Sequence, residues 1–173
     1  MKFFSGFSLQ NDAIFFNDFM SKSDFSVSGF SYGAMKAFEY VQDALKDGKR
    51  VDRLQLFSPA FFQSRDIKFK RLQTLSFKRS SDTYIREFIE SCFLPYEVQE
   101  VELIEGSLDE LNELLYYEWS RDALQKIVNQ GVIIEVYLGG NDKIIDVNAA
   151  REFFFDVATL TYIKRANHFL QLS

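Results

Sequence analysis

The segment Gly29-Phe30-Ser31-Tyr32-Gly33 places a serine between two glycines in the pattern Gly-x-Ser-x-Gly. A short strand-like run precedes it and an apolar helical pattern follows it, which predicts a sharp turn from strand to helix. Such a turn exposes the serine oxygen, and the glycines let the strand and the helix approach closely. The pattern therefore indicates that Ser31 is a nucleophile for acyl transfer.

A serine hydroxyl needs a base to remove its proton and a third group to orient that base. His168 is the only histidine in the chain, so any serine–histidine chemistry must use it. Asp142 directly follows a predicted strand and can turn toward His168, whereas Asp146 can instead cap the next helix. We therefore expect a catalytic triad of Ser31, Asp142 and His168, with Asp146 as the alternative acid.

Acyl transfer also needs two hydrogen-bond donors for the negative oxygen of the tetrahedral intermediate. The usual donors are the backbone N–H after the nucleophile and one in the loop after the first strand. Here these are the N–H groups of Tyr32 and Phe7. Gly6, which precedes Phe7, is also compatible with an ordinary turn.

The elements that must position these residues alternate between strand and helix. We expect strands at residues 2–4, 25–28, 53–57, 132–138 and 160–163. Helices are expected around residues 14–19, over 34–46 and over 146–156. This alternation predicts an α/β fold, with a mostly parallel sheet of about five strands and helices on both faces. Such sheets bind ligands at the carboxyl ends of their strands, where Ser31, Asp142 and His168 all lie.

The stretch from residue 60 to residue 130 interrupts this alternation with helical patterns only. They cover residues 67–77, 83–92, 108–117 and 121–129. We therefore expect a helical cap insertion at 60–130 on an α/β core made of residues 1–59 and 131–173, all in a single compact unit.

A cluster of basic side chains lies at the start of the insertion, in a chain of net charge −5. Its members are Arg65, Lys68, Lys70, Arg71, Lys78 and Arg79. Such a cluster would steer an acidic protein partner toward the site and act mainly on the association rate. The alternative is a solvated basic helix face without a partner.

Composition narrows the function classes. The net charge of −5 argues against a whole-surface attraction to nucleic acid. No stretch is long and apolar enough for a membrane helix, and the start of the chain turns polar too soon for a signal peptide, so we expect no membrane association and a cytoplasmic location. With Cys92 as the single cysteine and His168 as the single histidine, a transition-metal site would lack its usual ligands. We expect chemistry without a metal or another cofactor.

These motifs resemble those of the α/β-hydrolase superfamily. Gly29–Gly33 corresponds to its nucleophile elbow, Ser5-Gly6-Phe7-Ser8 to its oxyanion loop, Leu138–Ile145 to its acid loop and Asn167-His168 to its usual Gly-His pair. The chain order of nucleophile, acid and base is also that of the superfamily. Serines replace the histidine and the second glycine of the oxyanion loop, and the short distance from this loop to the elbow suggests that a strand and a helix are missing.

The chain resembles more narrowly a family of short pimeloyl-acyl-carrier-protein methyl ester esterases. The resemblance lies in its length, its opening Phe3–Phe7, its elbow Val27–Ala34 and its strand end Phe57-Ser58-Pro59. This resemblance implies a serine carboxylesterase that releases methanol from the methyl ester of pimeloyl-acyl-carrier protein in biotin biosynthesis. It also implies that the partner of the basic cluster is an acyl carrier protein with the pimeloyl methyl ester on its phosphopantetheine. The alternatives are an acyl thioesterase, a general short-chain esterase and a catalytically silent module that binds acyl carrier protein.

Overall fold

The computed structural model describes all 173 residues and contains a five-stranded parallel sheet in the order β1-β3-β4-β6-β7. Its strands are β1 (Lys2–Phe4), β3 (Ser26–Phe30), β4 (Arg53–Phe57), β6 (Ile133–Gly139) and β7 (Thr159–Ile163). Each strand pairs in parallel with its neighbour, and Phe30, Phe57 and Tyr137 stand side by side near the carboxyl ends. The α/β fold and the mostly parallel sheet are confirmed.

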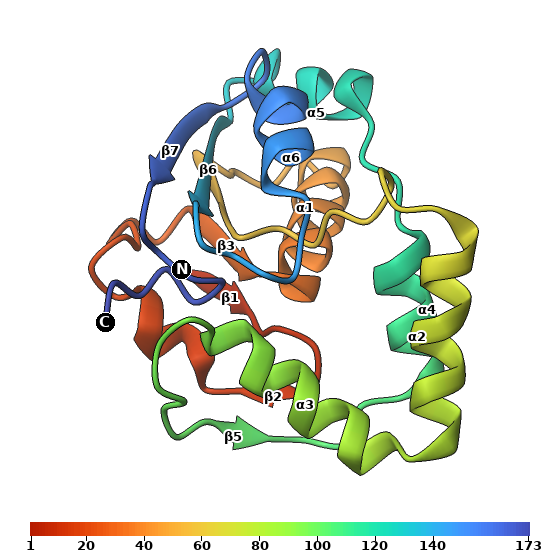
Figure 1. Cartoon of the computed structure of the whole chain (residues 1–173). Coiled ribbons are helices and arrows are strands. Elements are labelled where there is room, and N and C mark those ends of the chain that lie inside the picture. Colours follow the sequence, from red (N-terminus) through yellow and green to blue (C-terminus); the bar gives the residue numbers. More distant parts are fainter.

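Three α-helices cover the apolar face of this sheet (Figure 1). They are α1 (Tyr32–Lys46), α5 (Arg121–Val128) and α6 (Val147–Phe154). The strands alternate, so Leu54, Leu56 and Val136 point toward these helices and are fully buried. Trp119 joins the layer, because its ring packs edge-on against Phe154 at 5.2 Å. No helix has both the length and the apolar character needed to span a bilayer.

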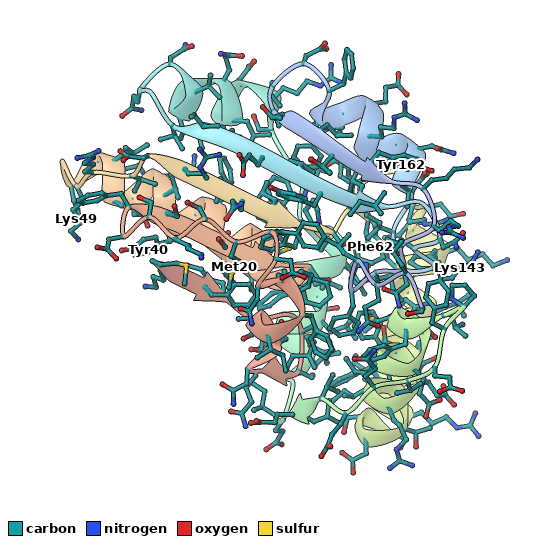
Figure 2. All side chains as sticks on the ribbon, turned by 90° about the vertical axis from the view of Figure 1, so that its left-hand side faces the viewer. Met20, Tyr40, Lys49, Phe62, Lys143 and Tyr162 are labelled. Carbon is teal, nitrogen blue, oxygen red and sulfur yellow. The ribbon has the colours of Figure 1, made fainter.

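The opposite face of the sheet carries a much shorter helix. In Figure 2 the strands face the viewer and α1 lies behind them. This face is covered by the 3-10 helix η1 (Asp12–Phe16), whose Phe16 ring stacks on Phe57 with centroids 4.7 Å apart. The helix expected around residues 14–19 therefore ends early, and Ile14 is exposed. The chain must leave the helix there, because residues 17–25 run back along the sheet to the start of β3.

The insertion forms a helical layer beyond the carboxyl ends of the strands. Its helices α2 (Ile67–Arg79), α3 (Ser81–Phe93) and α4 (Leu108–Tyr116) match the predicted patterns closely. α2 packs against both α3 and α4, whereas α5 packs against α1 (Figure 1). The sequence did not predict a small antiparallel ladder between β2 (Leu9–Gln10) and β5 (Glu102–Leu103), which ties the insertion to the loop after β1.

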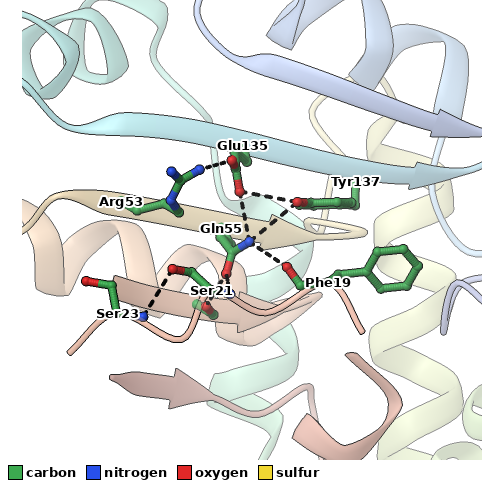
Figure 3. A network of polar contacts seen from close by, with 8 residues as sticks. Phe19, Ser21, Ser23, Arg53, Gln55, Glu135 and Tyr137 are labelled. Carbon is green, nitrogen blue, oxygen red and sulfur yellow. Dashed lines mark hydrogen bonds and ion pairs between the residues drawn. The ribbon is translucent and has the colours of Figure 1, made fainter. Parts of the chain in front are cut away.

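A polar network explains how the second sheet face manages without an α-helix (Figure 3). At its centre is Gln55, which is 1% exposed. Its amide nitrogen donates to the Phe19 carbonyl at 2.8 Å and to Glu135 at 2.8 Å, and its oxygen accepts from the Ser21 N–H at 2.8 Å. Glu135 in turn pairs with Arg53 on the neighbouring strand. The network binds residues 17–25 to the strands. Apolar side chains at the same positions would instead need a helix to cover them.

We expect Gln55→Leu to lower the free energy of unfolding by about 2–4 kcal/mol, because it leaves the Ser21 N–H and the Phe19 carbonyl without their buried partner. Urea unfolding followed by circular dichroism measures this change. Thr159→Ala is the control, since Thr159 is exposed and pairs with Glu135 in the ladder; it should change stability by less than about 0.5 kcal/mol. An equal free energy of unfolding for the two variants would show that the network does not stabilise the fold.

Candidate active site

Ser31 sits at the turn from β3 into α1 in a backbone conformation that is rare for serine. Its φ is 53° and its ψ is −112°. A non-glycine residue in such a conformation costs about 1–3 kcal/mol, so the surrounding contacts have to hold it there. The Ser31 N–H donates to the Phe57 carbonyl at 3.0 Å, and its carbonyl accepts from the N–H groups of Ala34 and Ala60, each at 3.1 Å. The predicted elbow is thus present and anchored to β4.

The two glycines of the elbow are required by close backbone approaches. A Cβ atom on Gly29 would lie 2.2 Å from the Gly33 carbonyl oxygen, and one on Gly33 would lie 2.0 Å from the Phe4 carbonyl oxygen. Both contacts are with backbone, which cannot move aside cheaply. The Gly-x-Ser-x-Gly spacing therefore packs α1 against β3 and against the end of β1.

A continuous chain of hydrogen bonds joins Ser31, His168 and Asp142. The His168 Nε2 atom lies 3.0 Å from the Ser31 Oγ atom, and its Nδ1 atom lies 2.6 Å from the Asp142 Oδ2 atom. The exposed fractions of the three residues are 2%, 0% and 8%. An ionised carboxylate only accepts, so Nδ1 carries the proton and Nε2 is free to take one from the serine. The structure thus brings the three predicted residues together in the geometry of a nucleophile, a base and an orienting acid.

The structure also distinguishes the two candidate acids. The second carboxylate oxygen of Asp142 accepts from the Ile144 N–H at 2.7 Å and the Ile145 N–H at 3.3 Å, which fixes the direction of the side chain. Asp146 instead accepts from the Ala149 N–H at 3.1 Å and caps α6. Each aspartate therefore has the contact expected for it, and only Asp142 contacts His168.

The loops that carry Asp142 and His168 are held against one another by backbone contacts. A Cβ atom on Gly139 would lie 2.2 Å from the Asn167 carbonyl oxygen, so β6 and the histidine loop meet without a side chain between them. The Asn141 N–H donates to the Ala166 carbonyl at 2.8 Å. Asn167 is fully buried, and its amide donates to the Phe93 carbonyl of α3 at 2.9 Å. His168 is thus positioned by both the sheet and the cap.

The predicted oxyanion donors have N–H groups available. Tyr32 is the first residue of α1, so its N–H has no partner inside the helix. The Phe7 N–H donates to no backbone atom, and the loop that carries it follows β1, which pairs with β3 beside the elbow. The Phe7 and Tyr32 rings contact one another at 6.5 Å between centroids. Whether both N–H groups bind an oxyanion stays a prediction.

A polar contact that the sequence did not predict links the elbow to the cap. The Tyr32 hydroxyl donates to the Glu113 carboxylate of α4 at 2.6 Å, and Lys36 pairs with the same carboxylate. Burial and the adjacent Glu113 carboxylate raise the pKa of the Tyr32 phenol. Partial burial alone would raise the pKa of Glu113, but its hydrogen bonds from Lys36 and Tyr32 outweigh burial and lower that pKa. No local pattern marks Glu113, because its partners are 77 and 81 residues away in the sequence.

Comparisons with known proteins give a match at the level of structure alone. No family model matches the chain, and no curated protein matches its sequence. Among solved structures, BioG from Haemophilus influenzae superposes with a TM-score of 0.58 at 12% identity, covering 98% of this chain and 88% of that chain. The naproxen esterase (carboxylesterase NP) from Bacillus subtilis gives a TM-score of 0.60 at 15% identity, over 99% and 77% of the two chains. The chain has the α/β-hydrolase fold.

This chain spans little more than half the length of several proteins whose structures it matches. The hydrolase olei00960 from Oleispira antarctica superposes with a TM-score of 0.63 at 11% identity, and this chain covers only 59% of it. Several further hydrolases are matched over little more than half of their length. The elbow, the acid loop and the histidine loop are nevertheless all present here.

A cavity of about 360 Å³ lies between the cap helices and the acid loop of the hydrolase fold. Phe69, Phe88 and Leu114 form part of its apolar wall, and Lys143 and Ile144 border it directly after Asp142 (Figure 2 labels Lys143). Ser31 is not part of the wall. The Phe7 ring lies between the cavity and the elbow. Its centroid is 6.0 Å from that of Phe88 in the cavity wall and 6.5 Å from that of Tyr32, which follows Ser31.

The predicted basic cluster splits into exposed and covered members. Lys68, Arg71, Lys78 and Arg79 are exposed on α2, and none of them pairs with a carboxylate. Lys70 is only 8% exposed and lies over the Tyr116 ring at 5.2 Å, while Arg65 is half-buried against Phe69. Lys70 is covered and Arg65 precedes the helix, so a docking surface on α2 could involve only the four exposed members.

Asp142→Asn should lower kcat by a factor on the order of 10⁴, because asparagine keeps the bonds from Ile144 and Ile145 but favours the wrong histidine tautomer. Asp146→Asn is the matched control and should keep nearly full activity. It changes only a helix cap, at a cost of at most about 1 kcal/mol in stability. Steady-state hydrolysis of p-nitrophenyl butyrate by both variants measures the difference. Equal activity of the two variants would contradict the assignment of the acid.

Proposed function

We propose that the protein is a serine carboxylic ester hydrolase. The observation that carries this proposal is the buried hydrogen-bond chain from Ser31 through His168 to Asp142 at the carboxyl end of an α/β-hydrolase sheet. The solved structures with this fold include named esterases, which supports the same class of reaction. All parts that acyl transfer to serine needs have a counterpart among the residues of the site.

The geometry accounts for each step of such a reaction. His168 takes the proton of the Ser31 hydroxyl as the oxygen attacks the ester carbonyl, and Asp142 stabilises the resulting imidazolium. The negative carbonyl oxygen accepts from the N–H groups of Phe7 and Tyr32. His168 then gives its proton to the departing alcohol. Water attacks the acyl-enzyme with His168 again as base, which releases the acid and restores Ser31.

The proposed substrate is the methyl ester of pimeloyl-acyl-carrier protein, which the enzyme converts to pimeloyl-acyl-carrier protein and methanol in biotin biosynthesis. The sequence resemblance to short esterases of this kind motivates the choice. The cavity beside the acid loop supports it, because its wall mixes apolar groups with polar ones, namely Gln73, Ser76, Glu87, Ser91 and Lys143. Such a wall suits a phosphopantetheine arm, which carries amides and a phosphate beside an aliphatic acyl chain.

The exposed face of α2 suits an acidic carrier protein as the partner. Lys68, Arg71, Lys78 and Arg79 share this face with three exposed aliphatic side chains, Ile67, Leu72 and Leu75. Their positions repeat at helical spacing, so cationic and aliphatic side chains alternate across one face of α2. Charges of this kind steer an acidic partner, and the aliphatic side chains between them give it apolar surface to bury. The inward face of the same helix lines the cavity.

The substrate is tested by offering pure enzyme the pimeloyl methyl ester on acyl carrier protein. We expect methanol and an intact pimeloyl thioester, measured by gas chromatography and by mass spectrometry of the carrier. Ser31→Ala should lower the rate by a factor on the order of 10⁶. Release of free carrier protein would identify a thioesterase, and hydrolysis of simple short esters alone would identify a general esterase. Absence of fluorophosphonate labelling at Ser31 in the folded protein would contradict any hydrolase and favour a binding module.

Docking is tested by reversing two charges on the α2 face. Arg71→Glu with Lys78→Glu should raise KM for the carrier-bound ester about tenfold at low salt and less at high salt, because rim charges act through association. The kcat for p-nitrophenyl butyrate should not change. Lys126→Glu, on the exposed side of α5, is the control and should leave both substrates unaffected. An unchanged KM for the carrier-bound ester would exclude this face.

A further inference from the structure

Asp12 is a buried carboxylate that takes no part in the triad. It is the first residue of η1 and is 1% exposed. None of the ion pairs of the structure includes it, and its Oδ1 atom has no hydrogen-bond partner. Burial raises the pKa of this carboxyl, against weaker opposing hydrogen bonds from Ser5 and Gly6. Burying a carboxyl group with an unsatisfied oxygen costs free energy. The hydrogen bond that Asp12 does make is therefore a candidate for its role in the protein.

That contact is with the loop expected to bind the oxyanion. The Oδ2 atom of Asp12 accepts from the Gly6 N–H at 2.9 Å. On its other side, the Gly6 carbonyl accepts from the Leu9 N–H at 3.2 Å. Both the N–H and the carbonyl of Gly6 are thus hydrogen-bonded. The peptide that contains the Gly6 carbonyl also contains the Phe7 N–H, so these two bonds determine where that N–H points.

Local backbone preferences do not favour this shape of the loop. Glycine tolerates rotation of its peptides at little cost, so Gly6 alone cannot fix the Phe7 N–H. Ser8 follows with a φ of 59°, a left-handed conformation that is unfavourable for serine, and its buried hydroxyl has no hydrogen-bond partner. The cap holds the loop after Phe7, because the Ser8 carbonyl accepts from the Ile104 N–H at 3.0 Å. Asp12 supplies an anchor from η1, whose Phe16 is itself packed on the sheet.

We propose that Asp12 is a positioning residue for the oxyanion hole, which acts through Gly6 to aim the Phe7 N–H at the transition state. The inference rests on the proposed hydrolase function. It assigns no proton transfer to Asp12, because only the acceptor oxygen is used. A bond to the loop that is made before the substrate binds lowers the barrier without strengthening ground-state binding.

The test compares Asp12→Ala, Asp12→Asn and the control Asp18→Ala, in which an exposed carboxylate of the same segment is removed. Asp12→Ala should lower kcat for p-nitrophenyl butyrate about 10- to 100-fold with KM changed by less than about threefold. The inhibition constant of a trifluoromethyl ketone, whose adduct on Ser31 carries an oxyanion, should rise by the same factor as kcat/KM falls. Asp12→Asn keeps the acceptor and should restore kcat to within about threefold of the wild type.

The outcomes separate the inference from the proposed function. A wild-type protein without Ser31-dependent hydrolysis would refute the hydrolase proposal itself. If the wild type is active and Asp12→Ala is equally active, or if kcat and ketone affinity fall by unrelated factors, Asp12 does not position the oxyanion hole. Urea unfolding shows whether each variant is folded in the assay. If Asp12→Ala is unfolded, Asp12→Asn decides alone, since a kcat below about one third of the wild-type value would overturn the inference.

Discussion

The left-handed backbone of Ser31 is the constraint on which the rest of the site depends. Its φ of 53° persists because Phe57, Ala34 and Ala60 hold both of its peptides and because Gly29 and Gly33, two residues away on either side, carry no Cβ. The same conformation directs the serine oxygen away from β3 and toward His168. Every other contact at the site can be understood as bringing a partner to that one fixed oxygen.

Backbone contacts, more than side-chain packing, set the distances between the catalytic loops. Gly33 lies against the end of β1, and Gly139 lies against the histidine loop, in both cases with a carbonyl where a side chain would be. Parallel strands deliver these loops to one edge of the sheet, and the glycines let them touch. The cap adds contacts to two of these loops, through Phe93 to Asn167 and through Glu113 to Tyr32.

The sequence predicted those parts of the fold and the site that have a local pattern. Strands, cap helices and the order of Ser31, Asp142 and His168 follow from periodicity and motif, and Asp146 was recognisable as a helix cap. Contacts between distant residues leave no such trace. The burial of Lys70 depends on where Tyr116 lies, and the role inferred for Asp12 depends on how the loop at Gly6 turns. The early end of η1 likewise reflects the bond between residues far apart, Ser21 and Gln55.

The polar network on the second face of the sheet lets a short helix and an extended segment cover that face without an α-helix. Gln55, Glu135 and Arg53 satisfy one another, and Gln55 also bonds residues 19 and 21, so an extended segment can cover the polar part of that face. The exposed positions on this side of the sheet have a practical use. Exposed positions such as Thr159 point away from α1, α5 and α6, so they offer attachment points for immobilising the protein on a support without blocking its cap.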